Sequence, residues 1–215
     1  MLCEPAPSIT DLVLGLAAVG LAAWLPRNAA ISRHWRPLFW WTGAAALAGA
    51  AHHGAVTCSE RWAGPSWAVV SVMVVVAISY LLAATVDEVL GPGRGRVFWV
   101  LRSAGLVAYA ALAVSGRAGV GSILLADGLT MIAVLALWAH AARLRLPLAW
   151  PVIAALLASG AAAGFRAAPT DITGVTGLDP ISLHHLAQIP GLVLLAMAVE
   201  RAARARAAVP GPAPA

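Results

Sequence analysis

The sequence contains no lysine, and its charged residues are few. Only 11% of its 215 residues are charged and 61% are hydrophobic, whereas ordinary soluble domains carry roughly 25% charged residues. Together with a mean hydropathy of +0.85, this composition excludes an ordinary soluble domain. The absence of lysine also excludes a retinal Schiff base and a pyridoxal aldimine, because both need a lysine amine.

Several motifs that identify soluble enzymes are missing as well. The chain has no Walker-type loop, no Cys-x-x-Cys and no Gly-x-Ser-x-Gly. Its two cysteines, Cys3 and Cys58, fall on the same predicted side of a membrane, so they form either a disulfide or two free thiols. A cleaved signal peptide is not expected, because Glu4 is present near the start and a basic region is not.

Seven apolar runs are long enough to cross a bilayer, which takes about 20 residues each. Breaks that contain Pro, Gly or Arg separate them. The runs cover residues 8–25, 37–57, 66–86, 97–115, 119–140, 147–165 and 180–200. We therefore expect an all-α polytopic membrane protein, with a seven-transmembrane-helix bundle over residues 1–208 and a disordered tail at 209–215.

The distribution of the fourteen arginines predicts the orientation. Ten fall on the side opposite the N-terminus, three fall on the N-terminal side, and Arg102 lies within the fourth run. The positive-inside rule then places the N-terminus outside and the C-terminus in the cytoplasm, in a bacterial inner membrane. Arg102 is expected to snorkel to the cytoplasmic surface and to pair with Asp87 or Glu88. The nine tryptophans are expected to be interface anchors.

The many arginines give the chain a high pI. They are spread over short loops and form no basic domain, so the high pI does not indicate a nucleic-acid partner. Membrane lipids are the expected partners.

Two histidine pairs lie inside apolar runs, His52-His53 near the end of the second and His184-His185 near the start of the seventh. Both pairs lie near the outer face in this topology. Ionisable groups in a membrane are costly and usually functional. Adjacent helical residues point about 100° apart, and we favour His53 and His185 as the interior members. Asp179 and Pro180 are expected to cap the last helix.

Asp127 in the fifth run lies at a similar predicted depth. Together with His52, His53, His184 and His185, it predicts a metal site, because imidazole and carboxylate suit zinc. Asp127 is the expected fourth ligand or general base, with Ser66 and Gln188 as polar support. Asp11, with Glu4 and Glu60, either contributes to such a site or simply caps the first helix.

The chain resembles the seven-helix membrane hydrolases that include alkaline ceramidases and the progestin and adiponectin receptors. The motifs are Gly49-Ala50-Ala51-His52-His53-Gly54 and Ser182-Leu183-His184-His185-Leu186-Ala187-Gln188. The resemblance implies a zinc held by histidines of helices two and seven, and cleavage of a lipid amide. It departs from the family where Ile181 replaces the first histidine of His-x-x-x-His and where Ala48 and Gly49 stand in place of a serine. The aspartate expected early in helix three is also missing.

The first functional hypothesis is therefore a zinc-dependent membrane amidohydrolase that acts on a lipid-like amide or ester near the outer leaflet. Two alternatives stay open. One is a membrane protein that binds haem b or a metal without hydrolysis, with histidines as axial ligands. The other is a structural or accessory membrane protein whose polar groups hold helices together.

Overall fold

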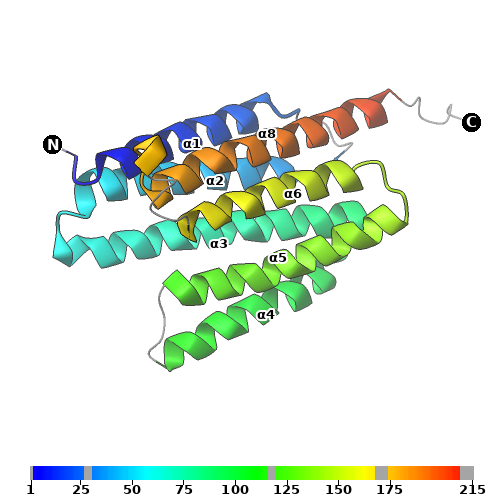
Figure 1. Ribbon diagram of the computed structural model, residues 1–215. Coiled ribbons are helices and arrows are strands. Elements are labelled where there is room, and N and C mark those ends of the chain that lie inside the picture. The colour runs from blue at the N-terminus through cyan, green and yellow to red at the C-terminus, as the bar shows by residue number, and fades with distance from the viewer. Residues whose placement is uncertain (1, 27–30, 116–119, 168–173, 209–215) are drawn as a thin grey trace, which may run out of the picture.

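In the computed structural model, which describes residues 2–26, 31–115, 120–167 and 174–208, long helices run side by side (Figure 1). Two short elements, η1 (His52–Val56) and η2 (Phe165–Ala167), extend α2 and α6. The described residues contain no strand, so the all-α prediction is confirmed. The predicted tail at 209–215 lies outside the described residues. The long helices are α1 (Pro5–Trp24), α2 (Trp35–Ala51), α3 (Glu60–Leu90), α4 (Gly95–Val114), α5 (Val120–Arg143), α6 (Ala149–Gly164) and α8 (Pro180–Ala207).

Four helical segments in the described part of the chain are long and apolar enough to cross a membrane. They are α1, α3, α8 and residues Leu125–Arg143 of α5, with mean hydropathies from 1.5 to 2.5. Ala149–Gly164 is a shorter apolar helix. By length and composition, the chain is a helical membrane protein.

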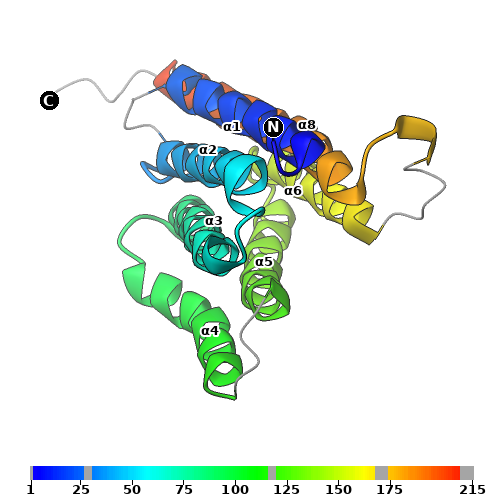
Figure 2. The same cartoon turned by 90° about the vertical axis from the view of Figure 1, so that its left-hand side faces the viewer.

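The helix order in space brings the first and last helices together. Figure 2 shows α1 beside α8 and α2 beneath α1, with α3 and α5 continuing the bundle. The same view places α4 at the margin, against α5. Residues near the N-terminus and near the start of α8 therefore come together, although almost 180 positions separate them in sequence.

Two of the nine tryptophans do not lie at an interface. Trp35 and Trp138 are buried in the core, with ring centroids 6.4 Å apart. The indole nitrogen of Trp138 donates to Thr85 Oγ1 at 3.0 Å. The indole nitrogen of Trp35 donates to Glu88 Oε1 at 3.4 Å. The prediction that these two are interface anchors was wrong, because partners inside the bundle satisfy both indoles, which would otherwise need water.

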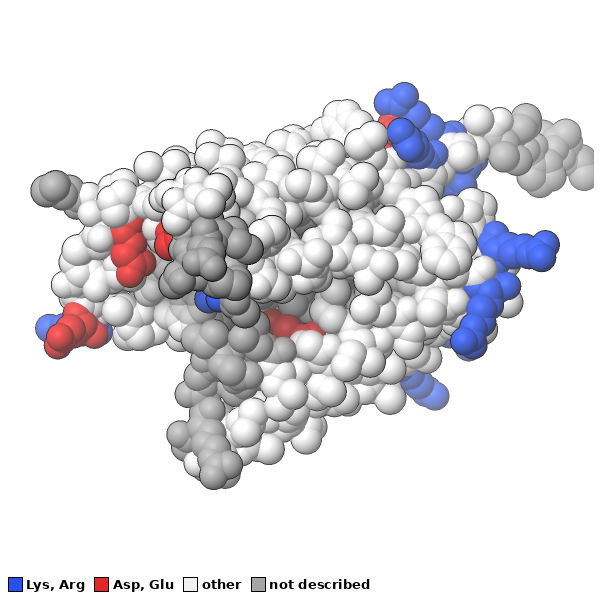
Figure 3. Space-filling view, in the orientation of Figure 1, with Lys and Arg blue, Asp and Glu red and all other residues white. Residues whose placement is uncertain are grey.

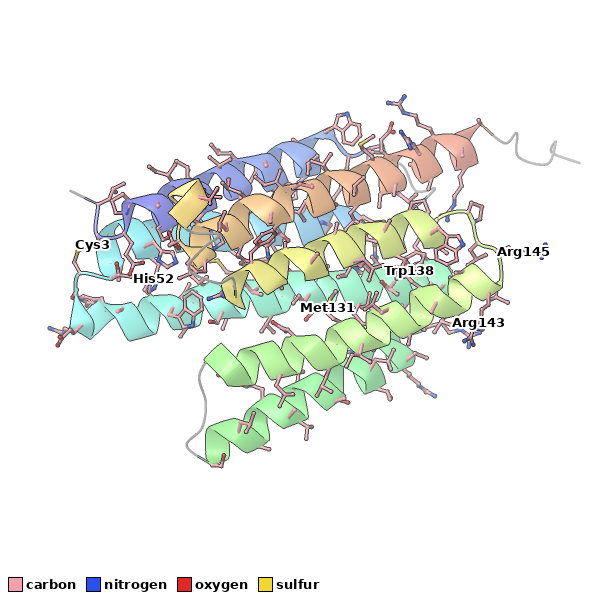
Figure 4. The ribbon with its side chains drawn as sticks, in the orientation of Figure 1. Cys3, His52, Met131, Trp138, Arg143 and Arg145 are labelled. Atoms are coloured by element: carbon pink, nitrogen blue, oxygen red, sulfur yellow. A yellow bond between two sulfur atoms is a disulfide. The ribbon has the colours of Figure 1, made fainter. Side chains whose placement is uncertain are left out.

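The two ends of the bundle differ in charge and chemistry. Figure 3 shows most of the visible arginine surface at one end and acidic side chains toward the other. Figure 4 places Cys3 and His52 at the end opposite Arg143 and Arg145. The histidine pairs and the arginine-rich loops thus belong to opposite ends of the molecule.

Candidate functional site

The N-terminal segment is tied to the end of α2 beside the first histidine pair. Cys3 and Cys58 form a disulfide with Cα atoms 5.6 Å apart. The amide of Cys3 donates to the carbonyl of Gly54 at 3.0 Å, and that of Glu4 donates to the carbonyl of His53 at 2.9 Å. Of the two interpretations of the cysteines, the disulfide is confirmed. It holds Glu4 directly over the His52-His53 pair.

α2 does not continue as an α-helix through its histidines. Residues His52–Val56 form a π-helix, closed by a bond of 3.0 Å from the amide of Thr57 to the carbonyl of His52. π-turns inside helices are rare and occur frequently at functional sites. The predicted helix to residue 57 therefore changes its geometry at the residues that carry the imidazoles.

Each of the four histidines directs its Nδ1 atom at an oxygen. His53 pairs with the carboxylate of Glu4. The partners of the others are Ser66 Oγ for His52 at 3.0 Å, the carbonyl of Ala162 for His184 at 3.0 Å, and both Thr10 Oγ1 at 3.2 Å and Asp11 Oδ1 at 3.4 Å for His185.

These partners determine where the imidazole protons lie. A carboxylate and a backbone carbonyl only accept, so Nδ1 carries the proton in His53 and His184. The hydroxyl of Thr10 donates to the carbonyl of Ala6 at 2.9 Å, so its oxygen accepts from His185. Metal-binding histidines commonly use one ring nitrogen in this way, because the hydrogen bond fixes the ring and leaves the other nitrogen for the metal.

The Nε2 atoms of the two pairs have different surroundings. That of His184 accepts from the amide of Gln188 at 3.1 Å, so both nitrogens of this ring are in use. Within the described residues, the Nε2 atoms of His52, His53 and His185 have no hydrogen-bond partner. The Nε2 atoms of His53 and His185 therefore retain a lone pair that a ligand could use, and that of His52 does so when Ser66 accepts from its Nδ1.

The four rings form a continuous row across α2–η1 and α8. Ring centroids are 5.1 Å apart for His52 and His53, 6.3 Å for His53 and His185, and 5.7 Å for His185 and His184. All four side chains are buried, with 7–9% of their surface exposed. The structure therefore brings together the two members that we favoured from the sequence, His53 and His185, at the middle of the row.

Asp11 lies between those two histidines and does not cap α1. The helix begins at Pro5, so Asp11 is in its second turn, and its Oδ2 is 4.0 Å from His53 Nε2. Gly49 makes this position available, because a Cβ at residue 49 would stand 2.4 Å from Asp11 Oδ2. The capping interpretation of Asp11 was wrong, since Pro5 at the first helical position starts the helix earlier.

The side chains of the row are not close enough together to form a complete coordination sphere. Among the described residues, no group of three or more His, Cys, Asp or Glu side chains is arranged to hold a metal ion. The donor types nevertheless suit zinc, and two imidazoles on one tetrahedral ion would have centroids about 5 Å apart. The observed separations of 5.1 and 6.3 Å are close to that value.

The carboxylate of Asp127 belongs to a different cluster. Its Oδ1 is buried without a hydrogen bond and lies 3.8 Å from Arg102 Nη1. Arg102 donates to Thr130 Oγ1 at 2.8 Å and to the carbonyl of Val75 at 3.2 Å. The expectation that Arg102 snorkels to the surface was wrong, because these partners satisfy it inside the bundle, where it is 1% exposed. Its contacts join α3, α4 and α5, and none of them is a histidine.

Two residues of the histidine cluster were given no role from the sequence. Thr10 lies in a segment that carried a capping signal, and Gly49 resembled the other small residues of the helices. Glu4 was expected only as part of an acidic group with Asp11 and Glu60. The spacing of Thr10 and Asp11 offered no signal, because their partner His185 lies 174 or more positions away. Only the pairing of α1 with α8 makes them part of the site.

Comparisons with known proteins place the chain in a family without placing it in a functional class. Neither a curated protein nor a solved structure shows detectable similarity to it. One family model matches nearly the whole chain, over residues 6–204. That range includes Asp11, all four histidines and the Arg102–Asp127 pair. The chain belongs to DUF6962, a family of unknown function.

Proposed function

We propose that all seven long helices cross the membrane, with the N-terminus outside and the C-terminus in the cytoplasm of a bacterial cell. The positive-inside rule supports this orientation, because arginines dominate the end that would face the cytoplasm. The disulfide between Cys3 and Cys58 at the opposite end supports it independently, because disulfides persist in oxidising compartments outside the cytoplasm. The histidine row then lies near the outer leaflet.

We propose further that the histidine row is the centre of a membrane hydrolase that cleaves a lipid-like amide or ester. The observation that carries this proposal is the hydrogen-bonded Nδ1 of each histidine, which leaves Nε2 lone pairs on His53 and His185, and on His52 when Ser66 accepts from its Nδ1. These three residues would hold a divalent metal such as zinc. When bound, such a metal would polarise the substrate carbonyl and activate a water.

The other residues of the row have supporting roles in this proposal. Glu4 and Asp11 orient His53 and His185 through Nδ1, and the Oδ2 atom of Asp11 faces His53 Nε2, where a carboxylate can accept a proton. His184 positions α6 against α8 through its bond to Ala162. Ser66 and Gln188 provide the polar support expected for them, on His52 and His184.

The test is hydrolysis of lipid amides and esters by the full chain in detergent, before and after metal chelation. We expect activity that chelation removes and zinc restores, and that His53→Ala and His185→Ala abolish. His140→Asn, an exposed histidine at the arginine-rich end, is the matched control and should leave activity unchanged. Equal activity in all three variants would contradict the proposal.

The same preparation tests the other two function classes. An absorption spectrum with a Soret band would indicate haem ligation by His53 and His185 in place of hydrolysis. Absence of both metal and pigment, with histidine variants that only lower the melting temperature, would identify the row as a structural polar network.

A further inference from the structure

A second site lies at the opposite end of the bundle, in a cavity of about 320 Å³ between α3 and α4. This volume is at the lower end of the range of known ligand pockets, ~300–1,000 Å³. Its lining is mostly apolar. The imidazole of His34 and the carboxylate of Asp87 lie at one end, and the hydroxyl of Ser79, further along α3, donates to the carbonyl of Val75 in its own helix at 2.7 Å. The residues that carry the argument are His34, Tyr80, Asp87, Gly95, Phe98 and Trp99.

The cavity is graded from polar to apolar along α3. Asp87 lies one turn before the end of this helix, Ala83 one turn earlier, and Val76 eleven positions before Asp87. Eleven residues of helix separate Val76 from Asp87, a rise of about 16 Å at 1.5 Å per residue. Trp99 on α4 is 63% exposed, so one wall faces the lipid. This gradient matches an amphiphile whose head group sits at the bundle end and whose chain enters the bilayer.

The two neighbouring acids at the end of α3 have different partners. Glu88 accepts from Arg206 at 2.7 Å, so an arginine balances its charge. Asp87 has no arginine at ion-pair distance among the described residues. Its partners are Ser32 Oγ at 3.0 Å and His34 Nε2 at 3.5 Å. The polar end of the cavity therefore presents a carboxylate that no arginine neutralises.

His34 does not balance that charge at neutral pH. Burial lowers the pKa of the His34 imidazole, Asp87 opposes the shift, and Arg33 adds to it. The neutral imidazole is therefore favoured. The aromatic rings of Tyr80 and Trp99 also line the cavity, and ring faces attract organic cations. A carboxylate and aromatic side chains in one cavity favour a ligand that carries an ammonium group.

Two arginines are sequence neighbours of a residue that lines the cavity. Arg94 and Arg96 flank Gly95, which lines the cavity at the start of α4, and both arginines are exposed. Exposed arginines at a membrane surface attract lipid phosphate. We propose that this cavity binds one zwitterionic phospholipid, with its ammonium on Asp87, its phosphate near Arg94 and Arg96, and an acyl chain along Val76 and Ala83.

The test is native mass spectrometry of the full chain in detergent, titrated with dioctanoyl phosphatidylethanolamine or dioctanoyl phosphatidylglycerol. The two lipids share phosphate and chains, and only the first carries an ammonium. We expect one phosphatidylethanolamine to bind at least tenfold more tightly than phosphatidylglycerol. Equal affinity for the two lipids would overturn the assignment without any variant being made.

Two variants locate the binding within the cavity. Asp87→Asn should weaken phosphatidylethanolamine binding at least fivefold and leave phosphatidylglycerol binding unchanged. Ala83→Phe should fill the apolar part of the cavity next to Asp87 and weaken the binding of both lipids. The matched control is Val72→Phe on the same helix, because Val72 is 61% exposed outside the cavity. Unchanged binding in Asp87→Asn and Ala83→Phe would overturn the site.

A third arm separates a lipid from a soluble ligand. Phosphoethanolamine carries the same head group without chains, and we expect its binding to be at least a hundredfold weaker. Binding as tight as that of the lipid would overturn the lipid assignment in favour of a free phosphoamine. None of these outcomes depends on the histidine row, so the result is independent of the proposed hydrolase activity.

Discussion

Replacing Gly49 by alanine adds one methyl group at the closest contact in the candidate site. The new Cβ would stand 2.4 Å from Asp11 Oδ2 and 3.1 Å from Asp11 Cγ. An ordinary C···O contact is about 3.3 Å, so the carboxylate must move by roughly 1 Å. Such overpacking typically costs about 1–3 kcal/mol, and the better helix propensity of alanine returns ~0.5–1 kcal/mol.

Gly160→Ala in α6 is the matched control, because a Cβ there meets no atom within 4 Å. This variant should gain only the ~0.5–1 kcal/mol that comes from the better helix propensity of alanine. The two variants should therefore differ by about 1–3 kcal/mol, or roughly 2–12 °C in melting temperature for a chain of this size. Melting in detergent, followed by tryptophan fluorescence, measures this difference.

Histidine-selective ¹⁵N NMR reports on the site itself. In Gly49→Ala the displaced carboxylate should shift the Nδ1 resonances of His185 and leave that of His34 unchanged. Equal melting temperatures for Gly49→Ala and Gly160→Ala, with unshifted His185 resonances, would refute the position assigned to Asp11.

Three further variants test the rest of the structure. Asp127→Asn leaves Arg102 buried without a counter-charge and should lower the unfolding free energy by about 3–5 kcal/mol while metal content stays unchanged; an equally stable protein would argue against the pair. Asp179→Ala removes an N-cap bonded to the amides of Ile181 and Ser182 and should cost about 1 kcal/mol. Burial opposes ionisation of Asp179, but the hydrogen bonds outweigh it and lower its pKa. Stability from this cap is therefore present above the usual aspartate pKa of about 3.9 and is lost as the pH falls through the lower folded-state value; a cap effect that grows with acidity in calorimetry would contradict this. Cys3→Ser should cost ~2–5 kcal/mol and release Glu4 from His53, so the His53 resonance in the same NMR experiment should shift. An unshifted His53 resonance would contradict the role given to the disulfide.

Helix positions were readable from the sequence because the hydrophobic runs and their Pro, Gly and Arg breaks are local signals. The cap at Asp179 followed from the same kind of signal, and the structure confirms its bonds to Ile181 and Ser182. Boundaries were less accurate. α3 begins at Glu60, six residues before the predicted start at 66, and includes Pro65, which leaves the carbonyl of Arg61 without its intrahelical donor.

Contacts between distant helices were not readable. Asp11 and Asp127 look alike in sequence, as single carboxylates in apolar runs. Gly49 lets α1 approach α2 and places Asp11 beside the histidines, whereas Arg102 takes Asp127 into another cluster. The burial of Trp35 and Trp138 likewise depends on which helices pack together, and hydropathy does not encode that choice.

We infer that His185 offers its Nε2 atom to a metal, whereas both nitrogens of His184 are already used, Nδ1 by the carbonyl of Ala162 on α6 and Nε2 by Gln188 on the same helix. Zinc per chain, measured by elemental analysis of the purified His185→Gln and His184→Gln proteins, tests this distinction between adjacent residues of one helix. We expect about one zinc in the wild type and in His184→Gln, and a loss of at least tenfold in His185→Gln. Equal zinc in both variants, or loss only in His184→Gln, would contradict the account.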